Sequence, residues 1–279
     1  MYTTSFDEFI SANGFSRPFP SNLYHYTSTD AAINILANGE FWLAHPKYFN
    51  DRQEYHDGVG IILSVLSSRA SELGPALLEA LKQVFLGQQH LNKPLNVGVL
   101  CFSGGKRDLL SQWRGYTKAN LGICLSVNTA TLYSQNIEAS LRRCIYSPTE
   151  KIEIVNKLVD DLLREYKGKS VAEVSAKAFW HFQQAALIFK SEAFDEEQEW
   201  RLITFTLANN DQRWNFRSVN STIIPYVKVK IDLKPCLDEV IVGPSENQEL
   251  TRNSLFFLMF KHEIWRNNIT ASSIPYRSL

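Results

Sequence analysis

The sequence has few of the features that assign a protein to a class at once. Its apolar runs fall short of the ~20 residues that a membrane helix needs. Its start, Met-Tyr-Thr-Thr-Ser-Phe-Asp-Glu, lacks the basic and apolar regions of a signal peptide. Neither glycine-rich phosphate-binding pattern, G-x-G-x-x-G after a strand or G-x-x-x-x-G-K-[ST], occurs. We therefore expect a cytoplasmic protein that acts on no membrane and binds no nucleotide in the Rossmann or P-loop manner.

The chain also has no excess of charge of either sign and little cysteine. Its 29 basic and 29 acidic residues give a formal net charge of zero over 279 residues. This balance disfavours bulk attraction to nucleic acid or anionic membranes. The four cysteines form no C-x-x-C pair and their spacing does not suit zinc, so we expect buried, reduced thiols and no metal.

What is present is typical of a globular α+β protein, with 44% hydrophobic and 21% charged residues. No linker or repeat divides the chain, so we expect a single domain over residues 1–279. Two capping boxes open a strongly helical stretch, which predicts a helical insertion at about 147–192. Apolar segments rich in strand formers predict strands at 23–27, 41–44, 96–102, 121–127, 143–146, 199–205, 223–231, 239–242 and 269–276.

The first expected strand carries a histidine between two tyrosines. Strand alternation sends His25 to one face and Tyr24 and Tyr26 to the other, with Thr27 on the side of His25. A hydrogen-bonded core histidine is the structural interpretation, and a ligand contact is the functional one. A polar loop, Tyr48-Phe49-Asn50-Asp51-Arg52-Gln53-Glu54, follows the second strand and either builds turns or forms the rim of a site.

The strand at 96–102 ends in a serine, Ser103, followed by two glycines. Polar residues at strand ends often line sites, because the scaffold is rigid and the loop is exposed. The short helix that we expect next contains Trp113, Arg114 and Tyr116. Trp113 and Tyr116 are three residues apart and share a helix face, which either enters the core or offers a flat surface to a planar ring.

An acidic run, Asp195-Glu196-Glu197-Gln198-Glu199-Trp200-Arg201, enters an apolar strand. If the strand begins early, Glu197, Glu199 and Arg201 face the same way. Acidic runs usually lie on a solvated surface, but carboxylates at the entrance to a core strand must be paired or functional. This segment is the most informative candidate for chemistry.

In order along the chain, these segments resemble the signature of a widespread bacterial family filed as a domain of unknown function. The shared motifs are Leu-Tyr-His-Tyr-Thr, Phe-Asn-Asp-x-x-Glu, Cys-Phe-Ser, Trp-x-x-Tyr, Gly-x-Cys-Leu, Glu-x-Glu-Trp-Arg-Leu-Ile and Val-Ile-Val-Gly. That family in turn resembles the ADP-ribosyltransferase superfold of DarT-like and poly(ADP-ribose)-polymerase-like enzymes. The resemblance implies split mixed or antiparallel β-sheets with flanking helices.

The resemblance also implies roles for the residues. Glu199 matches the catalytic glutamate of a Glu-x-Glu motif, Glu197 would activate the acceptor, and His25 would hold a ribose of NAD. The serine motif, Phe-Ser-Gly here instead of Ser-Thr-Ser, places Ser103 beside Glu199. The further residues that we expect to contact NAD are Tyr26, Thr27, Tyr48, Phe49, Asn50, Trp113 and Tyr116, since aromatic rings can stack on nicotinamide. Those that we expect to contact the acceptor are Arg52, Glu54, Arg114 and Arg201, and solvated loop charges are the alternative interpretation of Arg52 and Arg114.

NAD-dependent ADP-ribosyl transfer or NAD glycohydrolysis is therefore the first expectation, with NAD as substrate, no metal, and a protein or nucleic acid as acceptor. The family context implies a toxin or an antiviral defence effector, with an antitoxin or defence protein as partner. A second interpretation is a non-catalytic module that binds a nucleotide or nucleic acid. A third is a nucleic-acid hydrolase with Mg²⁺ held by Asp51, Glu54 and Glu197.

Overall fold

The computed structural model describes residues 5–49, 54–90, 96–117, 122–135, 137–166, 168–206, 211–219, 221–264 and 268–275. The chain divides into two compact units, each assembled from three stretches. The helical unit comprises Met1–Pro18, Pro46–Asn96 and Cys144–Asp195, and the sheet unit comprises Phe19–His45, Val97–Arg143 and Glu196–Leu279. The predicted helical insertion at about 147–192 accounts for one of the three stretches of the helical unit. That the chain is a single domain stays a prediction.

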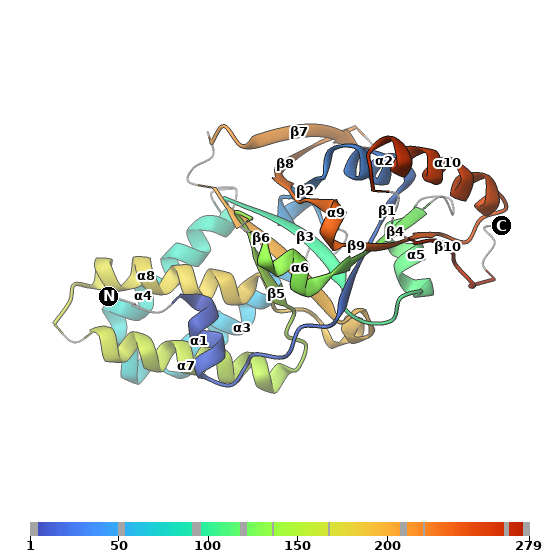
Figure 1. Cartoon of the computed structure of the whole chain (residues 1–279). Helices are drawn as coiled ribbons and strands as arrows, with labels where there is room; N and C mark the ends of the chain where they lie inside the picture. Colours follow the sequence, from blue (N-terminus) through green and yellow to red (C-terminus); the bar gives the residue numbers. More distant parts are fainter. Residues whose placement is uncertain are drawn as a thin grey trace. The chain divides into compact units, whose positions relative to one another are not determined.

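The sheet unit is built on ten strands within the described ranges (Figure 1). They are β1 (Asn22–Ser28), β2 (Glu40–Ala44), β3 (Val97–Ser103), β4 (Gly122–Asn128), β5 (Ser140–Arg143), β6 (Glu199–Phe205), β7 (Trp214–Val219), β8 (Thr222–Lys230), β9 (Leu237–Val242) and β10 (Asn268–Ala271). The order is β10-β9-β4-β1-β3-β2-β8-β7, and β6 pairs with β3 and β5. Only β9 and β10 pair in parallel. The predicted class, helices with mixed and mostly antiparallel strands, is confirmed in this coarse form.

Strand β3 joins three ladders of the sheet. It pairs with β6 along its whole length, from Val97↔Phe205 to Ser103↔Glu199. It meets β1 through the single pair Tyr24↔Ser103, and β2 through the single pair Ala44↔Val99. The end of β3 at Ser103 is therefore the place where β1, β3 and β6 come together.

Local chemistry explains how β1 continues into β2. The Ser28 side chain accepts a hydrogen bond from Ala31 N and caps helix α2 (Thr29–Asn38). Gly39 ends that helix with φ of 64°, and a Cβ at this position would lie 2.6 Å from the Ile231 carbonyl oxygen. Glycine is therefore required here both by the backbone conformation and by the close approach of β8's end.

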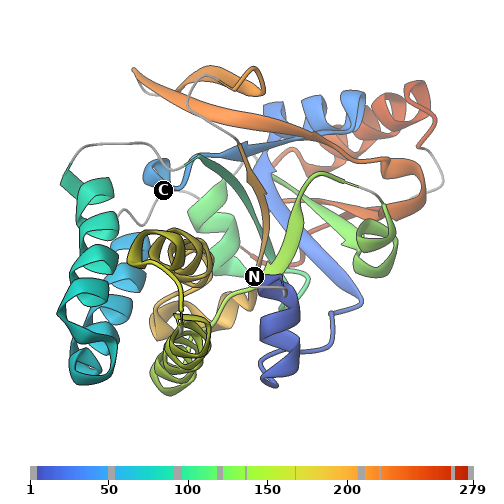
Figure 2. The same cartoon turned by 90° about the vertical axis from the view of Figure 1, so that its left-hand side faces the viewer.

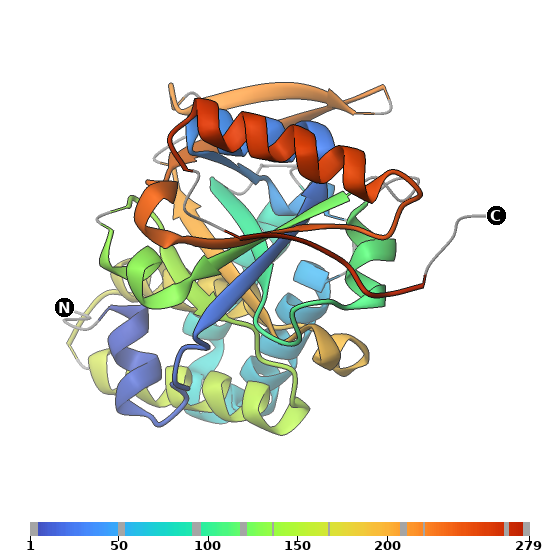
Figure 3. The same ribbon diagram turned by 45° about the vertical axis from the view of Figure 1, so that its right-hand side comes forward.

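Helices cover both faces of the β1-β4-β9 part of the sheet (Figure 3). Leu255 and Met259 of α10 (Gln248–Lys261) join α2 in the larger core, together with the apolar face of β1 and β4. On the other face, Trp113 of α5 (Leu110–Tyr116) packs with Tyr26 and Cys124. The sheet unit also contains α6 (Thr129–Ser134) and α9 (Leu233–Cys236). The 3-10 helix η3 (Glu192–Glu197) has its last two residues in this unit.

The helical unit contains α1 (Phe6–Ala12), the 3-10 helix η1 (Pro46–Tyr48), α3 (Glu54–Ser68), α4 (Ala70–His90), α7 (Pro148–Tyr166) and α8 (Val171–Ala186). Helices α3, α4, α7 and α8 pack against one another (Figure 2). Gly74 interrupts α4 with a non-helical backbone, at a φ of 73°. Of the two predicted capping boxes, the one formed by Ser170 and Glu173 at the start of α8 is confirmed. Among the described helices, none combines the length and apolarity that crossing a membrane requires.

Candidate functional site

The candidate site begins where β3 ends and β6 starts. The register pairs Ser103 with Glu199, so two segments that lie almost a hundred residues apart in the chain meet side by side. Ser103 Oγ donates a hydrogen bond to the Glu197 carbonyl oxygen at 2.8 Å. The resemblance implied that the serine lies beside Glu199. Ser103 is paired with Glu199 across the strands, but its hydroxyl bonds to the backbone of Glu197. Ser103 therefore holds the acidic turn in place.

The acidic turn is shaped by an unusual backbone conformation. Gln198, between the two glutamates, has a positive φ of 45°. Its carbonyl oxygen accepts a hydrogen bond from Gly104 N at 2.9 Å, and a Cβ on Gly104 would lie 2.8 Å from that same oxygen. Left-handed conformations at non-glycine residues are strained and persist where the surroundings hold them. Here the backbone after β3 does so.

Glu199 forms a buried ion pair with Arg201. Arg201 Nε donates to Glu199 Oε1 at 2.5 Å, and the two residues are 2% and 3% exposed. They lie on one face of β6, as strand alternation predicts. The guanidinium orients this carboxylate, since a charge-assisted hydrogen bond is short and directional. Arg201 is thus a partner of Glu199 within the protein.

A pocket opens beside this pair. It is partly open to solvent, and its lining comes wholly from the sheet unit. The lining residues are Tyr24, Tyr26, Cys101, Phe102, Ser103, Gln112, Tyr116, Glu197 and Glu199. Two carboxylates, three phenols, a hydroxyl and an amide therefore meet in one small space. Such a set of convergent polar groups in a concavity is the usual composition of a ligand site.

The tyrosines differ in what they can offer a ligand. Tyr26 is 4% exposed, and its hydroxyl donates to the Arg107 carbonyl oxygen at 3.0 Å and accepts from Leu109 N at 3.2 Å. Tyr116 keeps 38% of its surface exposed. Burial, followed by the nearby Cys101, Glu199 and Glu197, raises the pKa of its phenol. Tyr116 therefore keeps its proton and can present a ring and a donor to a ligand.

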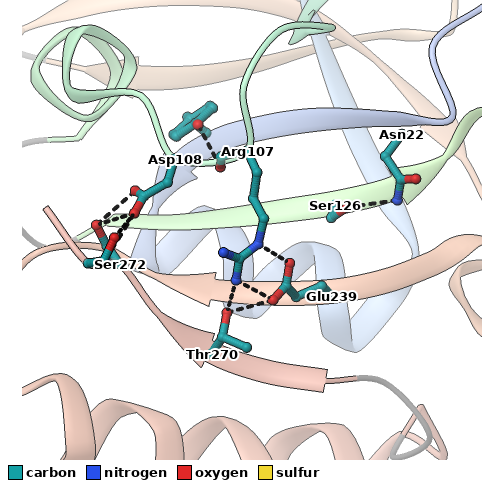
Figure 4. Close-up of polar contacts among 9 residues, drawn as sticks. Asn22, Arg107, Asp108, Ser126, Glu239, Thr270 and Ser272 are labelled. Atoms are coloured by element: carbon teal, nitrogen blue, oxygen red, sulfur yellow. Dashed lines mark hydrogen bonds and ion pairs between the residues drawn. The ribbon is translucent and has the colours of Figure 1, made fainter.

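The wall of the pocket formed by α5 is anchored by a polar network, part of which Figure 4 shows. Trp113 Nε1 donates to Asp108 Oδ1 at 2.6 Å, and Asp108 also accepts from Ser272 Oγ at 2.8 Å. Arg107 donates to both carboxylate oxygens of Glu239, at 2.6 and 2.5 Å. Burial alone would raise the pKa of Glu239, but the hydrogen bonds from Arg107 and Thr270 and the charge of Arg107 together outweigh it, so the pKa is lowered. These contacts tie the segment before α5 to β9 and the end of β10.

His25 lies on the other face of β1 and is absent from the pocket lining. Its ring makes edge contacts with Phe41 and Phe102, and its Nδ1 lies 3.1 Å from the Cys101 carbonyl oxygen. A carbonyl can only accept, so Nδ1 carries the proton. Burial lowers the pKa of His25 to about 4. The geometry matches the hydrogen-bonded core histidine, and the structure does not bring His25 together with Glu199.

The other predicted residues divide into three groups. Trp113 is 1% exposed and belongs to the core with Tyr26. Trp113, Thr27 and the exposed Arg114 do not line the pocket. Tyr48, Phe49 and Glu54 belong to the helical unit, so this site does not include them. Asn50, Asp51 and Arg52 lie outside the described residues.

Sequence reasoning missed four pocket residues, Tyr24, Cys101, Phe102 and Gln112. The signal for Tyr24 was present, because alternation places it with Tyr26 on the face opposite His25. Gln112 precedes Trp113 on the expected short helix, but no pattern marks it. Within the described ranges no group of three His, Cys, Asp or Glu side chains could hold a metal ion.

The fold and site together define a protein with a small polar pocket at a mostly antiparallel open sheet. Residues 112–202 match the model of a family described as a protein of unknown function, DUF2971. The matched stretch includes Gln112, Tyr116, Glu197 and Glu199 of the pocket. No curated protein and no solved structure matches the chain.

Proposed function

We propose that the sheet unit cleaves the nicotinamide–ribose bond of NAD and transfers ADP-ribose to water or to a protein or nucleic-acid acceptor. The observation that carries the proposal is the shared pocket of Glu197 and Glu199 with Ser103 and Tyr116. The resemblance of Glu197-Gln198-Glu199 to the Glu-x-Glu motif of ADP-ribosyltransferases supports the same chemistry. The acceptor, a toxin or defence role and a protein partner belong to this proposal.

The reaction needs a fixed negative charge. As the C–N bond breaks, nicotinamide leaves with the bonding electrons and positive charge develops on the ribose, as in glycoside cleavage. A carboxylate beside that charge stabilises it by electrostatic attraction. If the protein already holds the carboxylate in position, no free energy is spent on reorienting it during the reaction. Glu199 is such a carboxylate, since Arg201 Nε donates to its Oε1 and fixes its orientation at the pocket. Glu197 takes the proton of the attacking hydroxyl as a general base.

The reaction requires only one end of the dinucleotide, nicotinamide and its ribose, to reach the pocket. The pocket is partly open to solvent, so the rest of NAD can remain outside it. The partly exposed ring of Tyr116 can stack on nicotinamide, and Tyr24 and Gln112 can bind its amide or the ribose hydroxyls. We assign His25 no contact with NAD. It supports β3 instead.

The test is nicotinamide release from NAD by the full chain, measured by chromatography. Glu199→Gln is expected to lower the rate at least about 100-fold, as loss of one preorganised charge does. Glu196→Gln is the matched control, since Glu196 is an exposed member of the same acidic run. Glu197→Gln should reduce transfer to an acceptor more than hydrolysis. Wild-type turnover by Glu199→Gln would reject the catalytic assignment.

A second candidate is a module that binds a nucleotide without turnover. It is favoured by the buried ion pair, in which the protein's own Arg201 already engages Glu199. This candidate predicts that NAD raises the melting temperature by mass action while no nicotinamide appears. Stabilisation lost in Tyr116→Ala, with no product in any variant, would favour it over the enzyme.

A further inference from the structure

The sheet face that carries the pocket continues across three further strands. Residues paired directly across two strands point to the same face, and residues two apart within a strand do so as well. Val99, on the face of Ser103, pairs with Ala44 of β2, and Ala44 pairs with Tyr226 of β8. Side chains of β2 and β8 in this register therefore lie on the same face as Ser103.

An aromatic and cationic cluster lies on this part of the face. Trp42 and Tyr226 are stacked, with ring centroids 4.5 Å apart and an angle of 26° between the planes. Arg217 of β7 is paired with Ile224, so it shares the face, and its guanidinium carbon lies 5.7 Å from the centre of the Trp42 ring. A planar cation over an indole is a favourable cation–π arrangement. We call Trp42, Tyr226 and Arg217 the stacking cluster.

Arg217 differs from its cationic neighbours in its partners. Lys228 pairs with Glu40 at 3.0 Å, and Arg213 pairs with Asp211 at 2.9 Å. Arg217 forms no ion pair with any described residue, and its Nε is buried without an acceptor among them. Burial lowers the pKa of its guanidinium. A partly buried charge without a counter-ion costs free energy, which an anionic ligand would offset.

We propose that the stacking cluster is a nucleotide-binding subsite, in which a base stacks on the half-buried Trp42, backed by the buried ring of Tyr226, and a phosphate pairs with Arg217. The aromatic ring alone would bind any planar apolar group, and the guanidinium alone would bind any anion. Together they select a ligand that has both a planar ring and an anionic group. Base–aromatic stacking and Arg–phosphate pairing are the two interactions that nucleotide sites combine. The subsite does not depend on the NAD chemistry proposed for the pocket.

The test uses AMP, which has no nicotinamide bond, so its outcome is independent of NAD cleavage. Binding to the full chain is measured by calorimetry, with adenosine and inorganic phosphate as separate ligands. AMP is expected to bind more tightly than either part, and more weakly as salt rises. Trp42→Ala and Arg217→Ala should each raise the Kd for AMP by roughly 5- to 100-fold. Arg252→Ala is the control and should leave the Kd unchanged, because Arg252 lies on α10 and pairs with Glu249.

Two conservative variants keep the test valid if an alanine variant is unstable. Trp42→Phe retains an aromatic ring and should lose less affinity for AMP than Trp42→Ala. Arg217→Lys retains the positive charge but not the planar guanidinium that binds phosphate through two N–H groups, so it should lose less affinity than Arg217→Ala. An eight-nucleotide oligo(dA) distinguishes the source of the nucleotide: an affinity per base far above that of AMP indicates a single strand, and equal affinity a free nucleotide. Absence of AMP binding at millimolar concentration, or equal Kd values in wild type, Trp42→Ala and Arg217→Ala, would overturn the proposal.

Discussion

Replacing Asp108 by alanine should destabilise the sheet unit, because this carboxylate joins the start of α5 to the end of β10. Asp108 accepts hydrogen bonds from the indole of Trp113 at 2.6 Å, from Ser272 Oγ at 2.8 Å and from Ser273 N at 3.0 Å. Trp113 is 1% exposed, so its Nε1–H would be left buried without an acceptor. Ser273 is exposed and water can replace its bond.

The magnitude follows from these environments. A hydrogen bond to a charged group contributes about 1.5–3 kcal/mol, and leaving a buried donor unsatisfied costs a similar amount. With water replacing the exposed contacts, we expect a loss of about 2–3 kcal/mol for Asp108→Ala. Asp108→Asn should lose less, since its amide oxygen can still accept from Trp113, while its NH₂ group cannot accept from Ser273 N–H.

The assay is urea unfolding followed by tryptophan fluorescence, with the free energy of unfolding obtained by linear extrapolation. Asp238→Ala is the matched control, because Asp238 is exposed and accepts one bond in the described structure, from Asn22 Nδ2 at 2.7 Å. It should cost less than about 1 kcal/mol. If Asp108→Ala is no more destabilising than this control, the inference that Asp108 anchors α5 is wrong.

Two further perturbations test local features of the same unit. Burial lowers the pKa of His25 from 6.5 to about 4. Between these two pH values the unfolded chain binds a proton that the folded chain does not, so the free energy of unfolding decreases as the pH is lowered. Between pH 7 and 5 the wild type should lose about 2 kcal/mol more than His25→Gln in denaturant titrations, and equal losses would show that burial of this imidazole is not linked to folding. Gly104→Ala places a Cβ 2.8 Å from the Gln198 carbonyl oxygen and should cost about 1–3 kcal/mol. In Gly115→Ala the added Cβ meets nothing within 4 Å, so this helical variant should be neutral or stabilised, and equal melting temperatures for the two variants would contradict the steric argument.

Much of the local structure was predictable from residues whose conformational preferences are strong. The aromatic strand containing His25, the cap at Ser28 and the stop at Gly39 follow from strand propensity, side-chain capping and a positive φ. The pairing of Glu199 and Arg201 on one face follows from strand alternation. Each of these depends on neighbours within a few positions.

The arrangement of the site was less predictable because it depends on pairing between distant segments. Alternation separates His25 from Tyr24, but only the pair Tyr24↔Ser103 decides that the tyrosine face carries the pocket. The bond from Ser103 to the Glu197 backbone depends on the left-handed Gln198, a conformation that glutamine does not favour by itself. Trp113 was equally compatible with core and ligand surface until its partners were known.

The boundaries of several helices and strands were also not predictable from local sequence. Strand β7 was not predicted, because Trp214–Val219 mixes polar and apolar residues and is defined by its ladder with β8. Helix α10 was expected to be capped by Ser245, but it begins at Gln248 after Asn247. The predicted strand at 143–146 is observed at Ser140–Arg143, in register with β6.

The most direct test of the central claim is a crystal structure of the Glu199→Gln protein with NAD. We predict that the nicotinamide ring lies against Tyr116 and that the adjacent ribose contacts the side chain at position 199, within the pocket next to Ser103. NAD bound elsewhere on the protein, with this pocket filled by solvent, would contradict the account.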